Sequence, residues 1–362
     1  MFVREVTEQA HPCPSTPVSS VDAAWEALDR LSPVRLHGLL EGVAQDWIPD
    51  AVLHEDANQA VTVSEMPVFA VAAPLIQRNG TVLQPAQRQM SLTEALTLLR
   101  RPGRSSNAYI RSVPVEQFTA IRGQVPLPRG LVERLLSLAR LQAVNLWLGD
   151  GSMRSGLHFD AHDNLLLQLR GSKRVLLLPP DAHREAGYTL RPVRRFVYRN
   201  GQFVGSIPEG EPVENHSPLR IFEGQAPHVE APPHLADRVT ICTLERGQAL
   251  FIPALWSHAV ESLPETRVEA RALAARRDGS LPRTSPSPLN AAVNLWFLRS
   301  TRSLDEAVRL APSFAQARVC SGDALRTLGR HDEADHAFSA ALALQPGPSP
   351  RQWSVERDIK DT

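Results

Sequence analysis

The chain has 362 residues, 43% of them hydrophobic, and its 39 basic side chains (Lys+Arg) balance 39 acidic ones (Asp+Glu). The balanced charge argues against a nucleic-acid or membrane-surface protein, and without a membrane-span-length run or a signal-peptide-like N-terminus we expect a cytoplasmic or nuclear protein. The three cysteines, Cys13, Cys242 and Cys320, lie far apart without a CxxC pair, which argues against a disulfide framework and a thiolate zinc site.

The first 113 residues predict a loose tail followed by an α+β region. Residues 1–20 are rich in Ser, Thr and Pro, and a helix near 21–32 follows, with Ser20 or Asp22 as its cap. In SLTEALTLLRR, Ser91 and Glu94 form a capping-box pattern, which predicts a second helix. Residues 127–141 then have the apolar spacing of a third, amphipathic helix.

The centre of the chain, residues 114–300, is rich in apolar runs of strand length that end at Gly, Pro or Asp. The runs are AVNLWLGDG, SGLHFDAHDNLLLQLRG, KRVLLLPP, RVTICTLERGQALFIPAL, AVESL and AAVNLWFL. Such a series of short strands predicts a double-sheet jelly roll. Residues 181–237 and 264–290 interrupt the pattern, so we expect two long loops, the second of them disordered.

Residues 301–348 predict a C-terminal helical hairpin with the spacing of a tetratricopeptide repeat. Ala307 and Ala341 recur at a period of 34 residues, the length of that repeat, as do Pro312 and Pro346. Since a lone repeat cannot bury its own apolar face, the segment must pack on the main domain, on a second subunit or on a partner. Residues 349–362 form a final tail.

Two histidines and one aspartate predict a metal site. His158 and Asp160 are two residues apart, so on a strand both side chains project from the same face. His258 lies between apolar runs in FIPALWSHAVESL, on what we expect to be another strand. Two histidines and one carboxylate leave three positions of the metal open, the arrangement that non-haem iron(II) oxygenases use.

A lysine in the same region is a candidate partner for an anionic co-substrate. Lys173 follows His158 by fifteen residues and opens a strand after the RGS turn, so it can point into the same barrel. A buried carboxylate needs such a cation together with hydrogen-bond donors. Candidates for those donors are Ser155, Tyr109, Asn164 and Asn294.

Together, NLWLGDG, LHFDAHDNLLLQLRGSKRVLLLPPD, FIPALWSHAVESL and AVNLWF resemble the successive core strands of the Jumonji-C hydroxylases, the lysyl and asparaginyl hydroxylases above all. The resemblance covers roughly residues 100–300. It implies a mainly β fold with flanking helices, built on a double-stranded β-helix of the cupin type. It also implies an iron(II)-dependent oxygenase that uses 2-oxoglutarate and O2 and releases succinate and CO2.

Carried over by position, the resemblance implies that His158, Asp160 and His258 bind iron. Lys173, Ser155 and Tyr109 would hold the distal carboxylate of 2-oxoglutarate, and Asn164 and Asn294 would line the co-substrate site. Two features depart from the family: Ser257 and Ala259 flank His258 where relatives often have Trp and His, and the insertion 264–290 separates two strands.

The expected activity is hydroxylation of a side chain of another protein, of the lysyl type. The same chemistry on an N-methyl group would make the chain a demethylase, although nothing in the sequence announces a methyl-lysine cage. A third hypothesis is a non-catalytic adaptor that binds partners, or a second copy of itself, through its C-terminal segment. The basic stretch RPVRRFVYR, residues 191–199, gives a weaker indication of nucleic-acid binding.

Overall fold

A computed structural model describes most of the chain. The described residues are 11–18, 20–39, 54–67, 74–101, 106–124, 129–138, 140–222, 235, 237–263, 289–298 and 301–344. The predicted insertion 264–290 lies outside them except for its last two residues, and the predicted final tail 349–362 lies outside them entirely.

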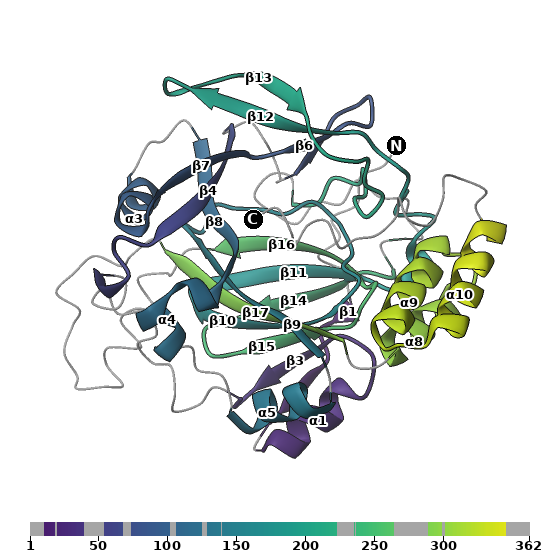
Figure 1. The fold of residues 1–362 in the computed structure, drawn as a ribbon. Coiled ribbons are helices and arrows are strands. Elements are labelled where there is room, and N and C mark those ends of the chain that lie inside the picture. The colour runs from purple at the N-terminus through teal and green to yellow at the C-terminus, as the bar shows by residue number, and fades with distance from the viewer. Residues whose placement is uncertain are drawn as a thin grey trace.

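Two β-sheets face each other and form the core of the molecule (Figure 1). The larger has nine strands: β2 (Ser15–Pro17), β3 (Val34–His37), β15 (Ala249–Ile252), β10 (Asp163–Arg170), β17 (Asn290–Leu298), β9 (Arg140–Gly149), β8 (Ser106–Pro114), β4 (Ala60–Pro67) and β7 (Ala86–Ser91), in that spatial order. The smaller has four: β1 (His11–Pro12), β14 (Thr240–Leu244), β11 (Ser172–Leu178) and β16 (Ser257–Leu263). This is the predicted jelly-roll core.

Alternation along each strand decides which side chains enter the space between the sheets. In β10, Leu166 belongs to a buried cluster that also contains Val175 and Leu177 of β11, so these residues fill the barrel. Leu165 and Leu167 point the other way and pack in a second cluster with helical side chains such as Trp25. The two clusters define an inner and an outer face of the larger sheet.

Four helices cover the outer face of the larger sheet, the three that the sequence predicts and the short α4, which it does not. They are α1 (Val21–Leu28), α3 (Leu92–Arg100), α4 (Thr119–Gln124) and α5 (Arg129–Leu138). The hydroxyl of Ser20 accepts a hydrogen bond from the Ala23 amide, and the capping box of Ser91 and Glu94 is formed. Throughout the described residues, no helix has both the length and the apolar character to cross a bilayer.

The N-terminal segment corrects two expectations. Residues 11–17, predicted to be a loose tail, run from the edge of one sheet to the edge of the other, because β1 pairs with β14 and β2 pairs with β3. Between these strands Cys13 forms a disulfide with Cys242 of β14. The spacing of the cysteines gave no sign of this bond, because their sequence separation of 229 residues is bridged only by the fold.

The predicted loop 181–237 contains a β-hairpin, so that prediction was wrong for its central part. Strands β12 (Val193–Arg199) and β13 (Gln202–Pro208) form a third sheet with β6 (Val82–Gln84) and β5 (Leu75–Ile76). Asn200 and Gly201 have positive φ values of 50° and 79°, as a two-residue hairpin turn requires, and Asn-Gly is the preferred sequence for it. This signal was present in the sequence.

The C-terminal segment consists of α8 (Arg302–Leu310), α9 (Ala315–Thr327) and α10 (His331–Leu344), which lie together at one end of the sheets (Figure 1). Apolar residues of α8 and α9 share a buried cluster with Phe159, Leu255 and Leu298 of the barrel. The segment therefore packs on the main domain, one of the three possibilities that its sequence left open.

Candidate metal centre

His158 and Asp160 lie on an extended segment before β10, and His258 is the second residue of β16. Residues 153–158 run antiparallel to β16 as an irregular continuation of the smaller sheet. The His158 amide donates to the His258 carbonyl at 3.0 Å, and the His258 amide donates to the His158 carbonyl at 2.7 Å. Directly opposed residues point to the same face, and the two imidazole centroids lie 4.3 Å apart.

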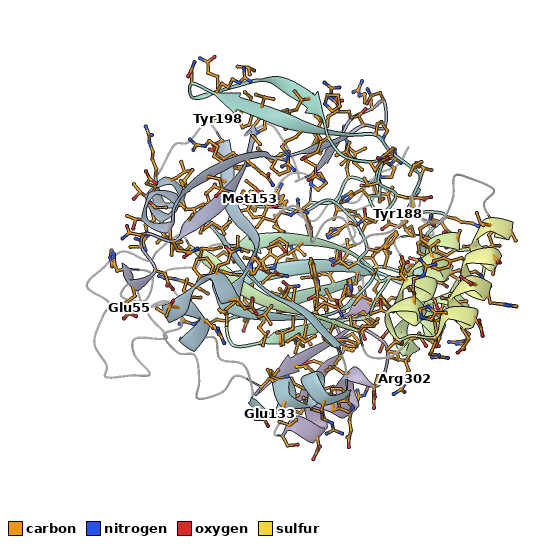
Figure 2. All side chains as sticks on the ribbon, viewed as in Figure 1. Glu55, Glu133, Met153, Tyr188, Tyr198 and Arg302 are labelled. Atoms are coloured by element: carbon orange, nitrogen blue, oxygen red, sulfur yellow. A yellow bond between two sulfur atoms is a disulfide. The ribbon has the colours of Figure 1, made fainter. Side chains whose placement is uncertain are left out.

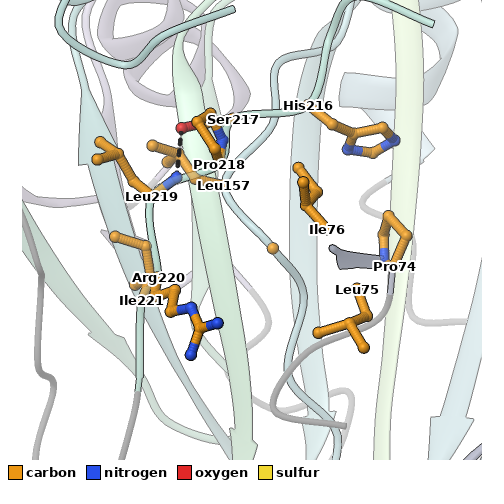
Figure 3. A pocket seen from close by; sticks show the side chains of 11 residues that line it. Pro74, Leu75, Ile76, Leu157, His216, Ser217, Pro218, Leu219, Arg220 and Ile221 are labelled. Atoms are coloured by element: carbon orange, nitrogen blue, oxygen red, sulfur yellow. Dashed lines mark hydrogen bonds between the residues drawn. The ribbon is translucent and has the colours of Figure 1, made fainter. Parts of the chain in front are cut away.

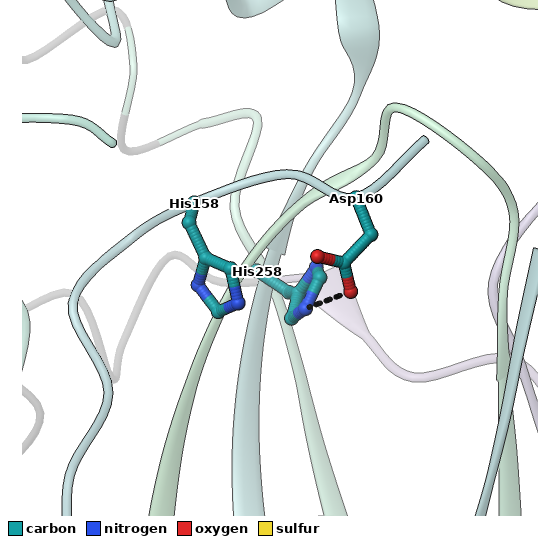
Figure 4. Close-up of side chains that lie close together, drawn as sticks. All are labelled: His158, Asp160 and His258. Atoms are coloured by element: carbon teal, nitrogen blue, oxygen red, sulfur yellow. Dashed lines mark ion pairs between the residues drawn. The ribbon is translucent and has the colours of Figure 1, made fainter. Parts of the chain in front are cut away.

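The three side chains converge, and the dashed line in Figure 4 marks the ion pair between His258 and Asp160. One ligand atom from each of His158, Asp160 and His258 lies within 4.8 Å of the others, and His258 Nε2 is 3.6 Å from Asp160 Oδ2. His158 Nδ1 is 2.9 Å from the Gly156 carbonyl oxygen, and His258 Nδ1 is 3.0 Å from that of Trp256. Since a carbonyl only accepts, both Nδ1 atoms donate, which leaves both Nε2 lone pairs for a metal.

Electrostatics keep His158 in the form that binds metals. Burial, assisted by the neighbouring His258, lowers the pKa of His158 to about 4. A metal-bound imidazole must be neutral, so no proton has to leave His158 near neutral pH. The donor set of two imidazoles and one carboxylate suits iron(II), and three positions around such an ion would stay open.

Lys173 lies in the barrel as predicted. On β11 it shares its face with Val175 and Leu177, whose side chains fill the inner cluster, and its backbone pairs with Ser262 of β16. Its Nζ donates to Ser262 Oγ at 2.7 Å, and no carboxylate among the described residues pairs with it. Burial lowers the pKa of Lys173 to about 7. A buried ammonium without an anionic partner is costly, which indicates an anionic ligand.

Ser155 lies on the other side of β16 from Lys173. Its hydroxyl accepts a hydrogen bond from the Val260 amide at 2.8 Å, so its own proton can be donated to a ligand. Tyr109 also faces the barrel, where it packs with Met66 and Met153, and burial raises the pKa of its phenol. Within the described part of the chain, no hydrogen bond joins Tyr109 to Lys173 or Ser155.

Asn164 and Asn294 face the barrel from the larger sheet and contact each other. Asn294 Nδ2 donates to Asn164 Oδ1 at 3.2 Å, and Trp147 Nε1 donates to Asn294 Oδ1 at 2.7 Å. Asn145 is paired with Asn294 across β9 and β17, and its buried Nδ2 has no partner among the described residues. The buried Nε1 of Trp296 is likewise without a partner there. These two donors indicate a polar ligand inside the barrel.

Sequence reasoning missed the inner side chains Asn145, Trp147 and Trp296. All three lie in NLWLGDG and AVNLWF, two of the apolar runs that predict core strands. A signal for them existed in the spacing. Asn145 and Trp147 are two residues apart on β9, and Asn294 and Trp296 are two residues apart on β17, so each pair lies on one face of its strand.

Two further side chains beside the metal centre carried no sequence signal. His216 is 6% exposed, its ring centroid is 5.7 Å from that of His158, and its Nδ1 has no partner among the described residues. Arg111 shares the inner face of β8 with Tyr109, next to a bulge at which Ser112 has a φ of 51°. Its Nη1 donates to Gln84 Oε1 at 3.2 Å. Both reach the site through contacts that only the fold creates.

A small pocket of about 40 Å³ lies beside the metal centre, between β5 and residues 216–221 (Figure 3). Gly156, Leu157 and His216 line it, whereas none of the three candidate ligands does. Leu157 belongs to an apolar cluster on the outer side of the smaller sheet. The pocket is therefore a side cavity and not the space in front of the three ligands.

The profile of the cupin-like domain family matches residues 23–303, more than three quarters of the chain. The chain belongs to the cupin-like family. This membership agrees with the predicted Jumonji-C resemblance and with the mainly β fold. The match ends at the start of the C-terminal helices, so their tetratricopeptide character remains a prediction.

Three relatives of this cupin-like chain show the range of activities among similar proteins. It is 27% identical to human "Bifunctional peptidase and (3S)-lysyl hydroxylase JMJD7" over 51% of this chain and 59% of that protein. It is 29% identical to "Lysine-specific demethylase JMJ32" of Arabidopsis thaliana over 34% and 38% of the two chains. It is 31% identical to human "tRNA wybutosine-synthesizing protein 5" over 41% and 37%. Each match spans less than two thirds of the relative.

Proposed function

We propose that this protein is an iron(II)- and 2-oxoglutarate-dependent oxygenase that releases succinate and CO2. The observation that carries the proposal is that His158, Asp160 and His258 share one barrel with Lys173, which has no carboxylate partner among the described residues. A metal triad alone would suit several metalloenzymes. A buried ammonium on the same inner face adds a site for a carboxylate, which a chelating dicarboxylate such as 2-oxoglutarate would satisfy.

Each inner side chain has a role in this proposal. His158, Asp160 and His258 would hold the iron, which supplies the oxygen chemistry when bound. Lys173 would bind the distal carboxylate of 2-oxoglutarate, with Ser155 and Ser262 as hydroxyl partners. Asn294, to which Trp147 donates a hydrogen bond, and its partner Asn164 would line the co-substrate site. Asn145 and Trp296 offer hydrogen-bond donors that no described residue uses. Tyr109, which packs beside Met66 and Met153, would be a further partner of the distal carboxylate.

The substrate we propose is a side chain of another protein, with hydroxylation of the lysyl type as the outcome. The likeness to a human (3S)-lysyl hydroxylase supports this choice. The likeness to a plant lysine-specific demethylase keeps N-methyl removal as the second candidate. The two outcomes differ in product, since hydroxylation adds one oxygen to the substrate and demethylation removes a methyl group as formaldehyde.

Contacts in the third sheet weaken a nucleic-acid role for the basic stretch 191–199. Arg195 pairs with Glu209, and Arg194 donates to the hydroxyl and carbonyl of Ser206. Arg191 donates to the Gly187 carbonyl at 3.0 Å. Three of the arginines in the stretch thus already have partners within the protein, which leaves little of the basic surface that phosphate binding needs.

The test is turnover by the purified full chain with iron(II), 2-oxoglutarate and a cell extract. We expect succinate to form, and mass spectrometry to find added oxygen or lost methyl on extract proteins. His158→Ala and Asp160→Ala should abolish iron binding and succinate formation with little change in melting temperature, whereas His331→Ala, at an exposed position of α10, should change neither. Unchanged iron affinity in a double variant of His158 and Asp160 would refute the proposal.

A further inference from the structure

The C-terminal helices contact the back of the candidate metal centre. Phe159 stands between the ligands His158 and Asp160 in the chain, so its side chain points away from theirs. It is 2% exposed and lies in one buried cluster with Leu304 of α8 and Ala317 of α9. The residues that set the position of two ligands are thus packed directly against the C-terminal segment.

Phe314, at the start of α9, makes the central contact. Its ring packs edge-to-face on Phe159 with centroids 5.3 Å apart and stacks on His183 at 4.5 Å. The ring of Tyr188 completes the group, 5.0 Å from Phe159 and 6.4 Å from Phe314. Figure 2 labels Tyr188 at the border between the sheets and the C-terminal helices. Phe314 itself is 2% exposed.

The same group of rings reaches the third ligand. The Tyr188 hydroxyl donates to Ser257 Oγ at 2.8 Å, and Ser257 directly precedes His258. Leu255, which belongs to the cluster of the C-terminal helices, donates its amide to the Asp160 carbonyl at 2.8 Å. Each of the three ligands therefore has a chain neighbour or a backbone contact that is held by the cluster around Phe314.

We propose that α8 and α9 are a positioning element of the metal centre, and that Phe314, through Phe159 and Tyr188, fixes where His158, Asp160 and His258 meet. The inference rests on the proposed function only in so far as these three residues bind a metal. Supporting residues behind metal ligands commonly change metal affinity ten- to 100-fold, because ligand geometry must be held within about half an ångström. Phe314 is a positioning residue and touches no ligand itself.

The C-terminal segment contains a matched control. Phe338 of α10 is 6% exposed and is buried against Val319, Leu325 and Ala334 of the helical segment, in a cluster without any barrel residue. Phe314→Ala and Phe338→Ala remove the same side chain from two well-packed sites of the same three helices. Only the first site contacts a chain neighbour of the metal ligands, Phe159.

The experiment is a titration of the full-length metal-free protein with Co(II), followed by its visible absorption, together with a thermal melt of each variant. We expect Phe338→Ala to lower the melting temperature but to leave the Co(II) affinity within about twofold of wild type. Phe314→Ala should lower both, with at least a tenfold loss of Co(II) affinity and an altered absorption band. Phe314→Leu, which keeps an apolar side chain of nearly the same length, should recover most of the affinity.

Equal Co(II) affinities in Phe314→Ala, Phe338→Ala and wild type would overturn the positioning role, and so would equal losses in both variants. If Phe314→Ala does not fold, the comparison uses Tyr188→Phe, which removes the hydrogen bond to Ser257. Wild-type Co(II) affinity and band shape in that variant would overturn the positioning role. A wild-type chain that binds no Co(II), or binds it equally well after His158→Ala, would instead refute the metal site and the proposed function with it.

Discussion

The buried ammonium of Lys173 indicates a negatively charged ligand. Its ammonium is buried, donates to Ser262 and faces no carboxylate among the described residues. An unpaired buried charge costs several kcal/mol, so a fold that keeps one gains from a compensating anion. Substitution of this residue therefore tests binding of the proposed co-substrate separately from binding of the metal.

Substitution of Lys173 should affect 2-oxoglutarate and spare iron. We expect Lys173→Ala to raise the half-saturating concentration of 2-oxoglutarate by roughly tenfold or more, the loss of an ion pair of about 1.4 kcal/mol or larger. Lys173→Arg should recover little, because a planar guanidinium does not replace a compact ammonium against Ser262. Titration at saturating iron measures both. Equal half-saturation in wild type and the two variants would show that Lys173 is an ordinary buried lysine.

The lowered pKa of Lys173 predicts how pH controls co-substrate binding. Below about pH 7 the ammonium is already present before the carboxylate arrives. Above that pH, binding must take up a proton, so the half-saturating concentration of 2-oxoglutarate should rise with pH, by up to about tenfold per unit. Lys173→Arg is the control, since guanidinium stays charged and its weaker binding should lack this rise. A pH profile of identical shape in both proteins would contradict the assignment.

At the scale of the element, the contact between α9 and α10 depends on a glycine. A Cβ built on Gly322 would lie 2.6 Å from Cε1 of Phe338, which is closer than real contacts allow. Gly322 thus lets the ring of Phe338 approach the α9 backbone.

Gly322→Ala should therefore destabilise the protein although alanine favours helix. We expect a loss of about 1–3 kcal/mol from overpacking, which exceeds the gain of up to about 1 kcal/mol in helix propensity. Gly123→Ala in α4 is the matched control, because a Cβ there would meet no atom within 4 Å, and it should be neutral or stabilising. Urea unfolding compares the two. A Gly322→Ala variant as stable as wild type would show that the Phe338 ring shifts freely.

At the scale of the whole molecule, the N-terminal segment joins the two sheets. β1 extends the smaller sheet, β2 extends the larger one, and Cys13 between them is bonded to Cys242. Cys242 faces the interior with Val175 and Leu177, so the bond ties residues 11–17 to the barrel itself. The cross-link closes a long loop of chain.

Breaking the Cys13–Cys242 bond should lower stability. Cross-links between distant residues stabilise small domains by about 2–5 kcal/mol, mainly by restricting the unfolded chain, so Cys13→Ser or a reductant should lower the melting temperature by several degrees. The reductant should have no further effect on Cys13→Ser. Alkylation of denatured, unreduced wild type should label Cys320 alone, and three labelled thiols would show that the bond is absent.

The sequence determined the inner face of the barrel because that information is local. A two-residue period places His158 with Asp160, and Lys173 with Val175, on one face of a strand, and capping at Ser20 and Ser91 sets helix starts within a few residues. The order of the strands then indicated a jelly roll. The hairpin at Asn200–Gly201 was equally local, and its signal was overlooked because the proline-rich flanks suggested a loop.

Only the tertiary structure decided which distant segments touch. Cys13 is bonded to Cys242, and the ring of Phe314 packs on that of Phe159. His216 and Arg111 lie near His158. No periodic pattern in the sequence predicts these contacts. An apolar face on a helix shows that something must cover it, but not what does, since burial free energy is non-directional. The sequence therefore predicted that the three candidate metal ligands and Lys173 share one barrel, and the fold decided which residues hold them in place.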